Sequence, residues 1–323
     1  MRFNLRIVMS SVFLSILVVS VVEQEDLSVV RAQNIEGNFN FVAAGDWGCG
    51  KDAHNTFGMM KTMEPELYLA LGDYSYEPSL GCWFNIVESA GPSLRVVVGN
   101  HDAEGSLVHT LMNKFNLAKQ YYSFDYHNAH FLALSSELNS GEDIGQFKFA
   151  SKDLSMAKSN PNIDWIIVYF HRPFYSGSGL DSTGMRDMYH PLFEKYGVDL
   201  VLTGHAHNYQ RSYPLSYNTA RPGRPLIADH NQFQYVNTTG TIFTIAGTGG
   251  ESIQGVDKKP YLASIYEGFG CLNVQINGRT LNAEFYTGAG KTIDHFGIVK
   301  NHSQQDRDTM KILHQVAYVR PLK

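Results

Sequence analysis

The sequence is short of the residues that mark several common kinds of protein. Its 323 residues contain three cysteines and no CxxC pair, which excludes a disulfide-rich scaffold and argues against a thiolate zinc site. Lys and Arg number 26 against 31 Asp and Glu, so a net charge of -5 offers no basic surplus for nucleic acid. Neither GxSxG nor the phosphate-binding patterns GxxxxGK[ST] and GxGxxG is present. What remains is an ordinary globular composition, long enough to bury an active site.

The N-terminus has the pattern of a secretory signal. Arg2 and Arg6 precede an uncharged, mostly apolar run over residues 7–22, and Ala32 ends a suitable cleavage site. Because a membrane-spanning helix needs ~20 apolar residues, residues 1–32 are predicted to be a signal peptide. The alternative is an uncleaved signal anchor. The protein is therefore expected to be secreted or extracytoplasmic, or lysosomal or vacuolar in a eukaryote.

Short β-type runs that stop abruptly at polar residues recur between residues 36 and 300. Such runs, bounded by turn residues, are typical of buried strands. Five of them cover residues 39–44, 67–71, 95–98, 163–170 and 198–203. Helices are predicted over 54–63, 146–158 and 184–196, which indicates an α/β sheet covered on both faces. Because ligands bind beyond the carboxyl ends of such strands, all five ends are expected at one rim.

The pattern changes after residue 210. Strands without intervening helices are predicted over 232–236 and 241–246, and a hairpin over 272–276 and 280–286 around Asn277-Gly278. This suggests a second, mostly antiparallel sheet packed on the first. One catalytic domain is expected over residues 36–300. A polar tail over 301–323 follows, for which no function is predicted.

The residues at the five strand ends have the chemistry of metal ligands. They combine carboxylate and amide oxygens with imidazoles, and neighbouring glycines permit sharp turns. Each alone is more often an ordinary turn or core residue, but five such ends in one domain favour a shared site. Seven ligands exceed what one metal takes and suit two metals that share a carboxylate. The seven are Asp46, Asp73, Tyr76, Asn100, His171, His205 and His207.

Two metals at such a site predict phosphoester hydrolysis. A metal pair ~3.5 to 4 Å apart clamps a phosphoryl group and makes hydroxide available near neutral pH.

One disulfide is also reasonable in an exported protein. Cys49 with Cys82 is the predicted pair, because both follow motifs placed at the same edge of a sheet, and the alternative is buried free thiols.

Five motif blocks, in order, resemble those of the purple acid phosphatases within the calcineurin-like metallophosphoesterase superfamily. Tyr76, three residues after Asp73, marks the purple enzymes. The resemblance spans roughly residues 40–290 and implies a four-layer αββα sandwich of two mixed β-sheets flanked by helices, with the metal site at the C-terminal strand ends. The blocks are Gly45-Asp46-Trp47-Gly48, Gly72-Asp73-Tyr74-Ser75-Tyr76, Gly99-Asn100-His101-Asp102, Val168-Tyr169-Phe170-His171 and Gly204-His205-Ala206-His207.

The resemblance also implies which metal each residue holds. Asp46, Tyr76 and His207 would bind Fe(III), Asp73 would bridge, and Asn100, His171 and His205 would bind a divalent ion. The residue chemistry agrees, because hard anionic oxygens suit Fe(III) and the neutral, imidazole-rich set suits Zn(II), Fe(II) or Mn(II). A phenolate bound to Fe(III) would give the purple absorption band of the family.

Substrate contacts are expected from residues beside the ligands. His101 resembles the family's outer-shell histidine, which holds phosphate and protonates the leaving alkoxide. Asp102 is expected either to orient His101 or to be a solvated turn carboxylate. The family has one or two more histidines in the loop after His171, but residues 172–184 contain none. Arg172 is the candidate substitute, because a guanidinium can hold phosphate bidentately, and the alternative is that nothing replaces them.

The sequence therefore predicts an acid phosphatase that hydrolyses phosphate monoesters by metal-bound hydroxide at a binuclear Fe(III)-M(II) centre. One alternative is a phosphodiesterase or nucleotide pyrophosphatase on the same scaffold. A remote alternative is an exported binding protein with a vestigial site. The expected partners are small phosphorylated substrates. No nucleic acid, protein partner or stable membrane association is expected, unless the signal is an uncleaved anchor.

Overall fold

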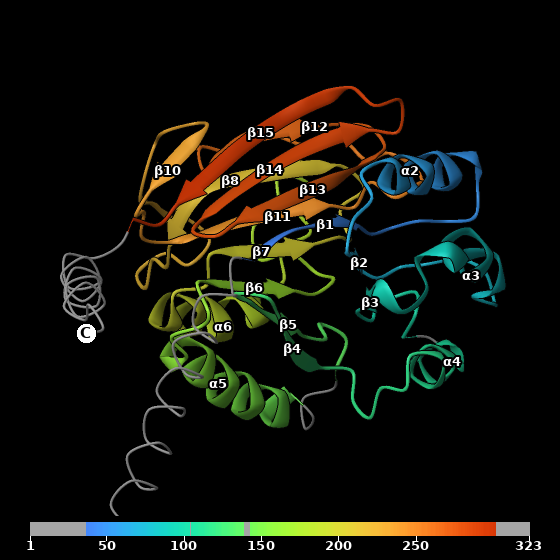
Figure 1. The fold of residues 1–323 in the computed structure, drawn as a ribbon, viewed down its shortest axis with the longest axis horizontal. Helices are drawn as coiled ribbons and strands as arrows, with labels where there is room; N and C mark the ends of the chain where they lie inside the picture. The colour runs from blue at the N-terminus through green and yellow to red at the C-terminus, as the bar shows by residue number, and fades with distance from the viewer. Residues whose placement is uncertain (1–36, 104, 139–142, 302–323) are drawn as a thin grey trace, which may run out of the picture.

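The computed structural model describes residues 37–103, 105–138 and 143–301. The predicted signal over 1–32 and the tail beyond residue 301 lie outside these residues. Two β-sheets pack face to face, with helices against their outer surfaces (Figure 1). In the part of the chain that is described, none of the helices has both the length and the apolar character needed to cross a bilayer.

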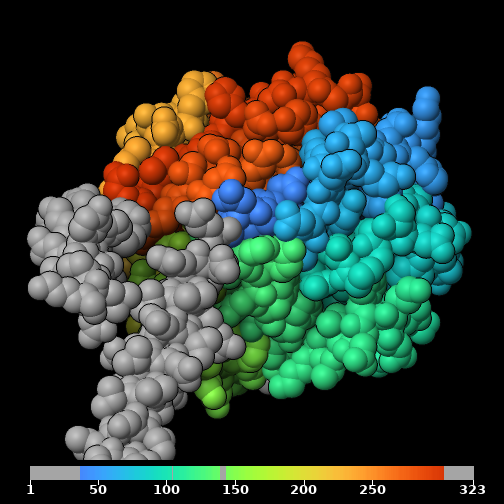
Figure 2. All heavy atoms as spheres, in the orientation of Figure 1, coloured from blue at the N-terminus to red at the C-terminus, as the bar shows by residue number. Residues whose placement is uncertain are grey.

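One sheet, sheet A, has seven strands in the order β10-β15-β14-β13-β1-β2-β3. Strands β1, β2 and β3 run parallel, and β13 joins the free side of β1 in antiparallel fashion. Residues from the two ends of the described chain therefore lie side by side (Figure 2). The strands are β1 (Asn38–Ala44), β2 (Leu67–Ala70), β3 (Leu94–Val96), β10 (Gln234–Val236), β13 (Gly270–Asn277), β14 (Thr280–Thr287) and β15 (Thr292–Val299).

The other sheet, sheet B, has eight strands, in the order β12-β8-β11-β7-β6-β5-β4 with β9 beside β8. Strands β5, β6, β7 and β11 are parallel, and β8 is antiparallel to β11. The strands are β4 (Tyr122–Tyr126), β5 (Ala129–Ala133), β6 (Trp165–Tyr169), β7 (Leu200–Thr203), β8 (Tyr209–Ser216), β9 (Leu226–Ile227), β11 (Thr241–Ala246) and β12 (Leu262–Tyr266).

Helices cover both outer faces, as Figure 1 shows. α2 (Lys51–Thr62), α3 (Gly81–Val87) and α4 (Leu107–Lys114) contribute to the apolar cluster on the outer side of sheet A. A 3-10 helix, η1 (Glu88–Ser93), follows α3. α5 (Asp143–Ser159) and α6 (Thr183–Tyr196) pack on sheet B. The predicted αββα sandwich of two mixed sheets is therefore confirmed.

The alternation of side chains along β6 shows why a continuous apolar run makes a buried strand. Trp165, Ile167 and Tyr169 lie in the layer between the sheets. Ile166 and Val168 lie in the layer under α5 and α6. Successive side chains point to opposite faces of a sheet, so a strand covered on both sides needs apolar residues at every position.

The predicted division into an α/β sheet and a later antiparallel sheet is wrong. The five motif strands divide between the sheets, with β1, β2 and β3 in sheet A and β6 and β7 in sheet B. The predicted hairpin, β13 and β14, completes sheet A, and β11 completes sheet B. The physical reason is that the free sides of β1 and β7 needed partners, which later strands supply from far along the chain.

A buried ion pair joins the two sheets. Arg211 of β8 is fully buried and Asp294 of β15 is 5% exposed. Arg211 donates from Nε and Nη2 to the two carboxylate oxygens of Asp294, at 2.6 and 2.9 Å. Tyr209 also donates to Asp294, at 2.8 Å. Each buried charge is thus paired and hydrogen-bonded, as burial requires.

Candidate metal centre

The seven predicted ligands come together where the carboxyl ends of the two sheets meet. Sheet A contributes the residues that follow β1, β2 and β3, and sheet B those that follow β6 and β7. Four of the seven have a left-handed backbone: φ is 60° at Asp46, 53° at Asp73, 56° at Tyr76 and 69° at His205. Residues other than glycine rarely adopt this conformation, and such strain gathers at functional sites.

Tyr76 lies at the centre of one group of ligands. Its hydroxyl is 3.1 Å from Asp46 Oδ1, 3.4 Å from Asp73 Oδ2 and 3.0 Å from His207 Nε2. Burial, together with the charges of Asp46 and Asp73, raises the pKa of Tyr76 well above its usual range. A cation held among these oxygen atoms would oppose this shift.

A second group contains Asp73, His171 and His205. One ligand atom of each lies within 4.8 Å of the other two. His171 Nε2 is 3.1 Å from Asp73 Oδ2 and 3.2 Å from Asn100 Oδ1. Asp73 therefore belongs to both groups and contacts Tyr76 in one and His171 in the other.

Buried charges shape this second group. Burial opposes ionisation of His171, but Asp73 raises the pKa of His171, and His171 in turn lowers the pKa of Asp73. Burial and the nearby charges of His171 and Arg172 lower the pKa of His205 to about 3. The donor set of carboxylates, amide oxygen, phenol and neutral imidazole fits a pair of first-row metals.

Two of the histidines are held by backbone carbonyls. The Nδ1 atom of His171 lies 2.8 Å from the carbonyl oxygen of Leu71, and that of His207 lies 2.8 Å from that of Ser252. A carbonyl can only accept, so each Nδ1 carries a proton, which leaves Nε2 as the nitrogen that could bind a metal.

Two glycines leave room that any side chain would fill. A Cβ atom added at Gly204 would lie 2.5 Å from Asp46 Oδ2. One added at Gly72, where φ is 91°, would lie 2.7 Å from His171 Nδ1. Both approaches are closer than a carbon atom tolerates, so the glycines of the motif blocks are needed for the ligands to fit.

Neither expectation for Asp102 is correct. Its carboxylate is 1% exposed and does not contact the His101 ring. It accepts hydrogen bonds from the backbone N–H groups of Asp73, Tyr74 and Gly99, at 2.7, 3.0 and 2.9 Å. The reason is local: these amides point inward at two adjacent strand ends, and a buried carboxylate satisfies them. Asp102 therefore ties the loops after β2 and β3 together.

His101 lies at the exposed side of the centre. Its backbone N–H donates to Asp73 Oδ1 at 2.8 Å, and its ring lies 4.4 Å from the Tyr76 ring, centre to centre. The side chain is exposed, so the ring is free to meet a substrate. Asp181, in the histidine-free loop over residues 172–184, accepts the backbone N–H of Ser176 at 2.5 Å.

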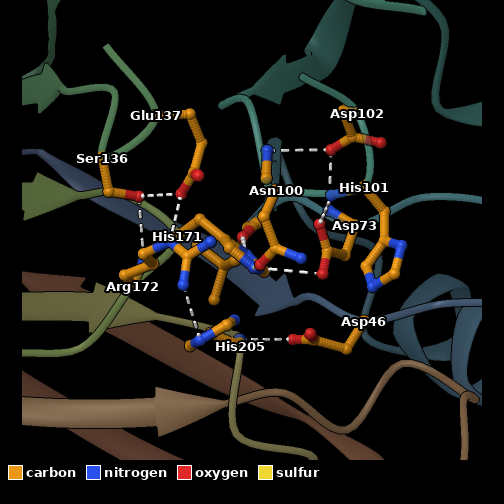
Figure 3. A network of polar contacts seen from close by, with 12 residues as sticks. Asp46, Asp73, Asn100, His101, Asp102, Ser136, Glu137, His171, Arg172 and His205 are labelled. Carbon is orange, nitrogen blue, oxygen red and sulfur yellow. Dashed lines mark hydrogen bonds and ion pairs between the residues drawn. The ribbon is translucent and has the colours of Figure 1, made fainter. Parts of the chain in front are cut away.

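Arg172 does face the centre, together with a residue that sequence reasoning missed. Arg172 Nε donates to Glu137 Oε1 at 2.8 Å, and Arg172 Nη1 lies 3.1 Å from His205 Nε2 (Figure 3). Glu137 follows β5, whose apolar run ends in Ser135-Ser136-Glu137. An apolar run that stops at polar residues also marks the five predicted strand ends. The sequence therefore contained the pattern that could have identified Glu137 as a candidate.

The predicted disulfide is also present. Cys49 and Cys82 are bonded, with their Cα atoms 5.8 Å apart. The bond joins the loop after β1 to the start of α3, close to the loops that carry Asp46 and Tyr76. Cys271 is free and buried.

The αββα sandwich and the oxygen and imidazole side chains gathered at its strand ends point to one family of proteins. The family model for calcineurin-like phosphoesterases matches residues 39–209, and the chain belongs to that family. The matched residues include all seven predicted ligands.

Similar proteins are named as phosphatases. Phosphoenolpyruvate phosphatase of onion (Allium cepa) is 25% identical over 246 residues, which cover 67% of this chain and 49% of the onion protein. Purple acid phosphatase 22 of Arabidopsis thaliana is 26% identical over 212 residues, 58% of this chain and 48% of that protein. The resemblance predicted from the motif blocks is confirmed. The chain spans about half the length of these two relatives.

A solved structure shares the fold. The purple acid phosphatase PPD1 from yellow lupin seeds superposes with a TM-score of 0.71 at 20% identity. The superposition covers 85% of this chain and 55% of the lupin chain.

Proposed function

We propose that the protein is an acid phosphatase of the purple type, which hydrolyses phosphate monoesters at a binuclear Fe(III)-M(II) centre. The observation that supports this most is the position of Asp73 between an oxygen-rich group around Tyr76 and the imidazoles His171 and His205. Asp46, Tyr76 and His207 would hold Fe(III). Asn100, His171 and His205 would hold Zn(II), Fe(II) or Mn(II). When bound, such a pair neutralises phosphate charge and acidifies water.

The chain's own residues would supply the remaining chemistry. His101, exposed beside Tyr76, is placed to bind the phosphate and to give a proton to the leaving alkoxide. General acid help of this kind contributes about 10²- to 10⁴-fold in rate. Arg172, on the opposite side of the centre, would hold phosphate oxygens through its guanidinium.

The decisive experiment is metal analysis and an absorption spectrum of one purified sample of the full chain. We expect iron, a divalent metal, and a visible band that disappears in the Tyr76→Phe variant while the divalent metal remains. Tyr209→Phe is a matched control, because Tyr209 is buried between the sheets and bonds Asp294. A sample that hydrolyses phosphate esters but contains no iron would disprove the purple assignment and leave a phosphoesterase.

Substrate choice separates the proposed monoesterase from the phosphodiesterase alternative. p-Nitrophenyl phosphate should be cleaved faster than its bis ester. The reverse result would favour the diesterase, because residues 172–184 bring no histidine to the site. Absence of both activities in a metal-loaded sample would favour a vestigial site.

We also propose that the protein is exported to a secreted, lysosomal or vacuolar compartment. The Cys49–Cys82 disulfide supports this location, because disulfides persist in oxidising compartments. Reduction of the bond in a sample taken from its native compartment would argue against export.

A further inference from the structure

The three imidazoles of the metal centre differ in their hydrogen-bond partners. His171 and His207 each donate from Nδ1 to a backbone carbonyl. His205 instead has its Nε2 atom 3.1 Å from Arg172 Nη1. A guanidinium can only donate hydrogen bonds, so His205 must be the acceptor in this contact.

This contact leaves His205 without a free lone pair. A neutral imidazole carries one proton and one lone pair on its two nitrogens. With the Nε2 lone pair directed to Arg172, the proton is on Nδ1. His205 can ligate a metal through Nε2 only if Arg172 withdraws. Ligation through Nδ1 moves the proton to Nε2, where it would face a donor. By either route, His205 serves Arg172 or a metal, and not both.

Arg172 can withdraw from His205 without losing its position. Its Nε bonds Glu137 Oε1 at 2.8 Å, and this bond uses a different nitrogen from the one that meets His205. Ser136 Oγ bonds both residues of this pair. It accepts the backbone N–H of Arg172 at 3.0 Å and donates to Glu137 Oε1 at 2.9 Å. The Glu137 side chain is 9% exposed and that of Arg172 is 35% exposed. The outer guanidinium nitrogens can therefore reach a ligand while Nε stays fixed.

We propose that Arg172 exchanges His205 for the phosphate of the substrate when the divalent position is filled, and that Glu137 is the positioning residue that holds Arg172 for this exchange. The inference rests on the proposed function. Phosphate suits the released guanidinium, because two parallel N–H groups match two phosphate oxygens. Metal loading would thus prepare the site for its substrate.

The exchange predicts opposite effects on two binding constants. Zn²⁺ is titrated into the metal-free full chain, and inorganic phosphate into the Zn²⁺-loaded chain, both by calorimetry. Arg172→Met should bind Zn²⁺ about three- to tenfold more tightly, because the competing hydrogen bond is gone. It should bind phosphate about 10- to 100-fold more weakly. Arg224→Met, which removes an exposed arginine elsewhere, should match the wild type in both.

Several results would overturn the exchange. If Arg172→Met weakens both constants, Arg172 only supports the local structure, and if it changes neither, the contact has no role. If the wild type binds one Zn²⁺ and Arg172→Met binds two, Arg172 blocks the site and does not exchange. Arg172→Lys provides a second variant should the methionine variant fail to fold, and an intermediate loss of phosphate affinity is expected. A wild type that binds no metal would instead disprove the proposed function.

A double-mutant cycle tests Glu137. In the wild type, Glu137→Gln should weaken phosphate binding about threefold or more, because Arg172 loses its anchor. In the Arg172→Met background the same change should have no further effect on phosphate binding. Losses that simply add would show that Glu137 does not act through Arg172.

Discussion

The two sheets contribute different atoms to the metal centre. The strand ends of sheet A supply oxygen ligands, from two carboxylates, a phenol and an amide, whereas those of sheet B supply three imidazoles. Backbone amides donate to the carboxylates of Asp73 and Asp46, whereas backbone carbonyls hold two of the three imidazoles. Each half alone resembles half of a metal site. Each of the two proposed metal positions would draw ligands from both sheets, so neither sheet alone would complete one.

The largest effect is expected at Asp73, which contacts residues from both sheets. Asp73→Asn leaves the shape of the side chain but removes the charge that would bridge both metals. We expect phosphatase activity to fall at least about 10³-fold, since several kcal/mol of charge stabilisation is lost. Bound metal should fall with it, as measured by elemental analysis. Asp257→Asn makes the same charge change at a side chain that is 83% exposed, and should leave both unchanged. Full metal content and activity in Asp73→Asn would contradict the bridging role.

The next largest effect concerns the joint between the sheets. Asp294→Asn leaves Arg211 buried without its counter-charge, so the free energy of unfolding should fall by about 3–5 kcal/mol. Urea unfolding of the full chain measures it. The control is Asp257→Asn, whose side chain is 83% exposed beside Lys259, itself 38% exposed. An exposed pair contributes about 0–1 kcal/mol. Equal losses in the two variants would show that the buried pair is not what couples the sheets.

A smaller effect is expected within the oxygen half. Asp102→Asn places a donor where the backbone N–H groups of Asp73, Tyr74 and Gly99 need acceptors. Unfolding free energy should fall by about 1–3 kcal/mol and metal affinity by about 10- to 100-fold. Urea unfolding and metal titration measure these changes, with Asp257→Asn at an exposed carboxylate as control. Loss of activity at full metal content would instead support an action of Asp102 on His101.

The smallest effect on stability is expected at His130, an imidazole that lies outside the metal centre. His130, 6% exposed, lies between Asp125 and Asp153, at 2.6 and 2.8 Å. Burial opposes the charge, but the two carboxylates raise the pKa of His130 above its ordinary ~6.5.

A raised pKa in the folded state stabilises the protein below ~6.5, and this contribution is lost as pH rises through the folded value. His130→Gln should therefore lower the unfolding free energy by about 1–2 kcal/mol at pH 5.5, with the difference shrinking at alkaline pH. Urea unfolding across pH measures it, and exposed His109→Gln is the control. A difference that grows with pH would contradict this assignment.

Much of the fold could be predicted from the sequence because its signals are local. The helices predicted over 146–158 and 184–196 correspond to α5 and α6, which begin within three residues of the predicted starts. The hairpin predicted at Asn277-Gly278 is present, with φ of 55° at Gly278. These elements depend on side-chain periodicity and turn chemistry, which neighbouring residues determine.

The partition of strands between the sheets could not be predicted in the same way. Strand β13 pairs with β1, and Asn38 lies opposite Asn277 in that pairing. An apolar run indicates that a strand is buried, but it does not indicate which strand lies beside it. For the same reason the partner of Arg211, which is Asp294, could not be read from the sequence.

The sequence by itself determined the chemical types of the candidate ligands, because each follows an apolar run within its own motif block. It also indicated Cys49 and Cys82 as disulfide partners, but left buried free thiols open until the structure showed the bond. Only the tertiary structure decided which sheet carries each candidate ligand, that Asp102 binds backbone amides, and that Glu137 holds Arg172 beside His205. These relations join residues on different strands, so they depend on pairing and packing across the whole sandwich rather than on any local pattern.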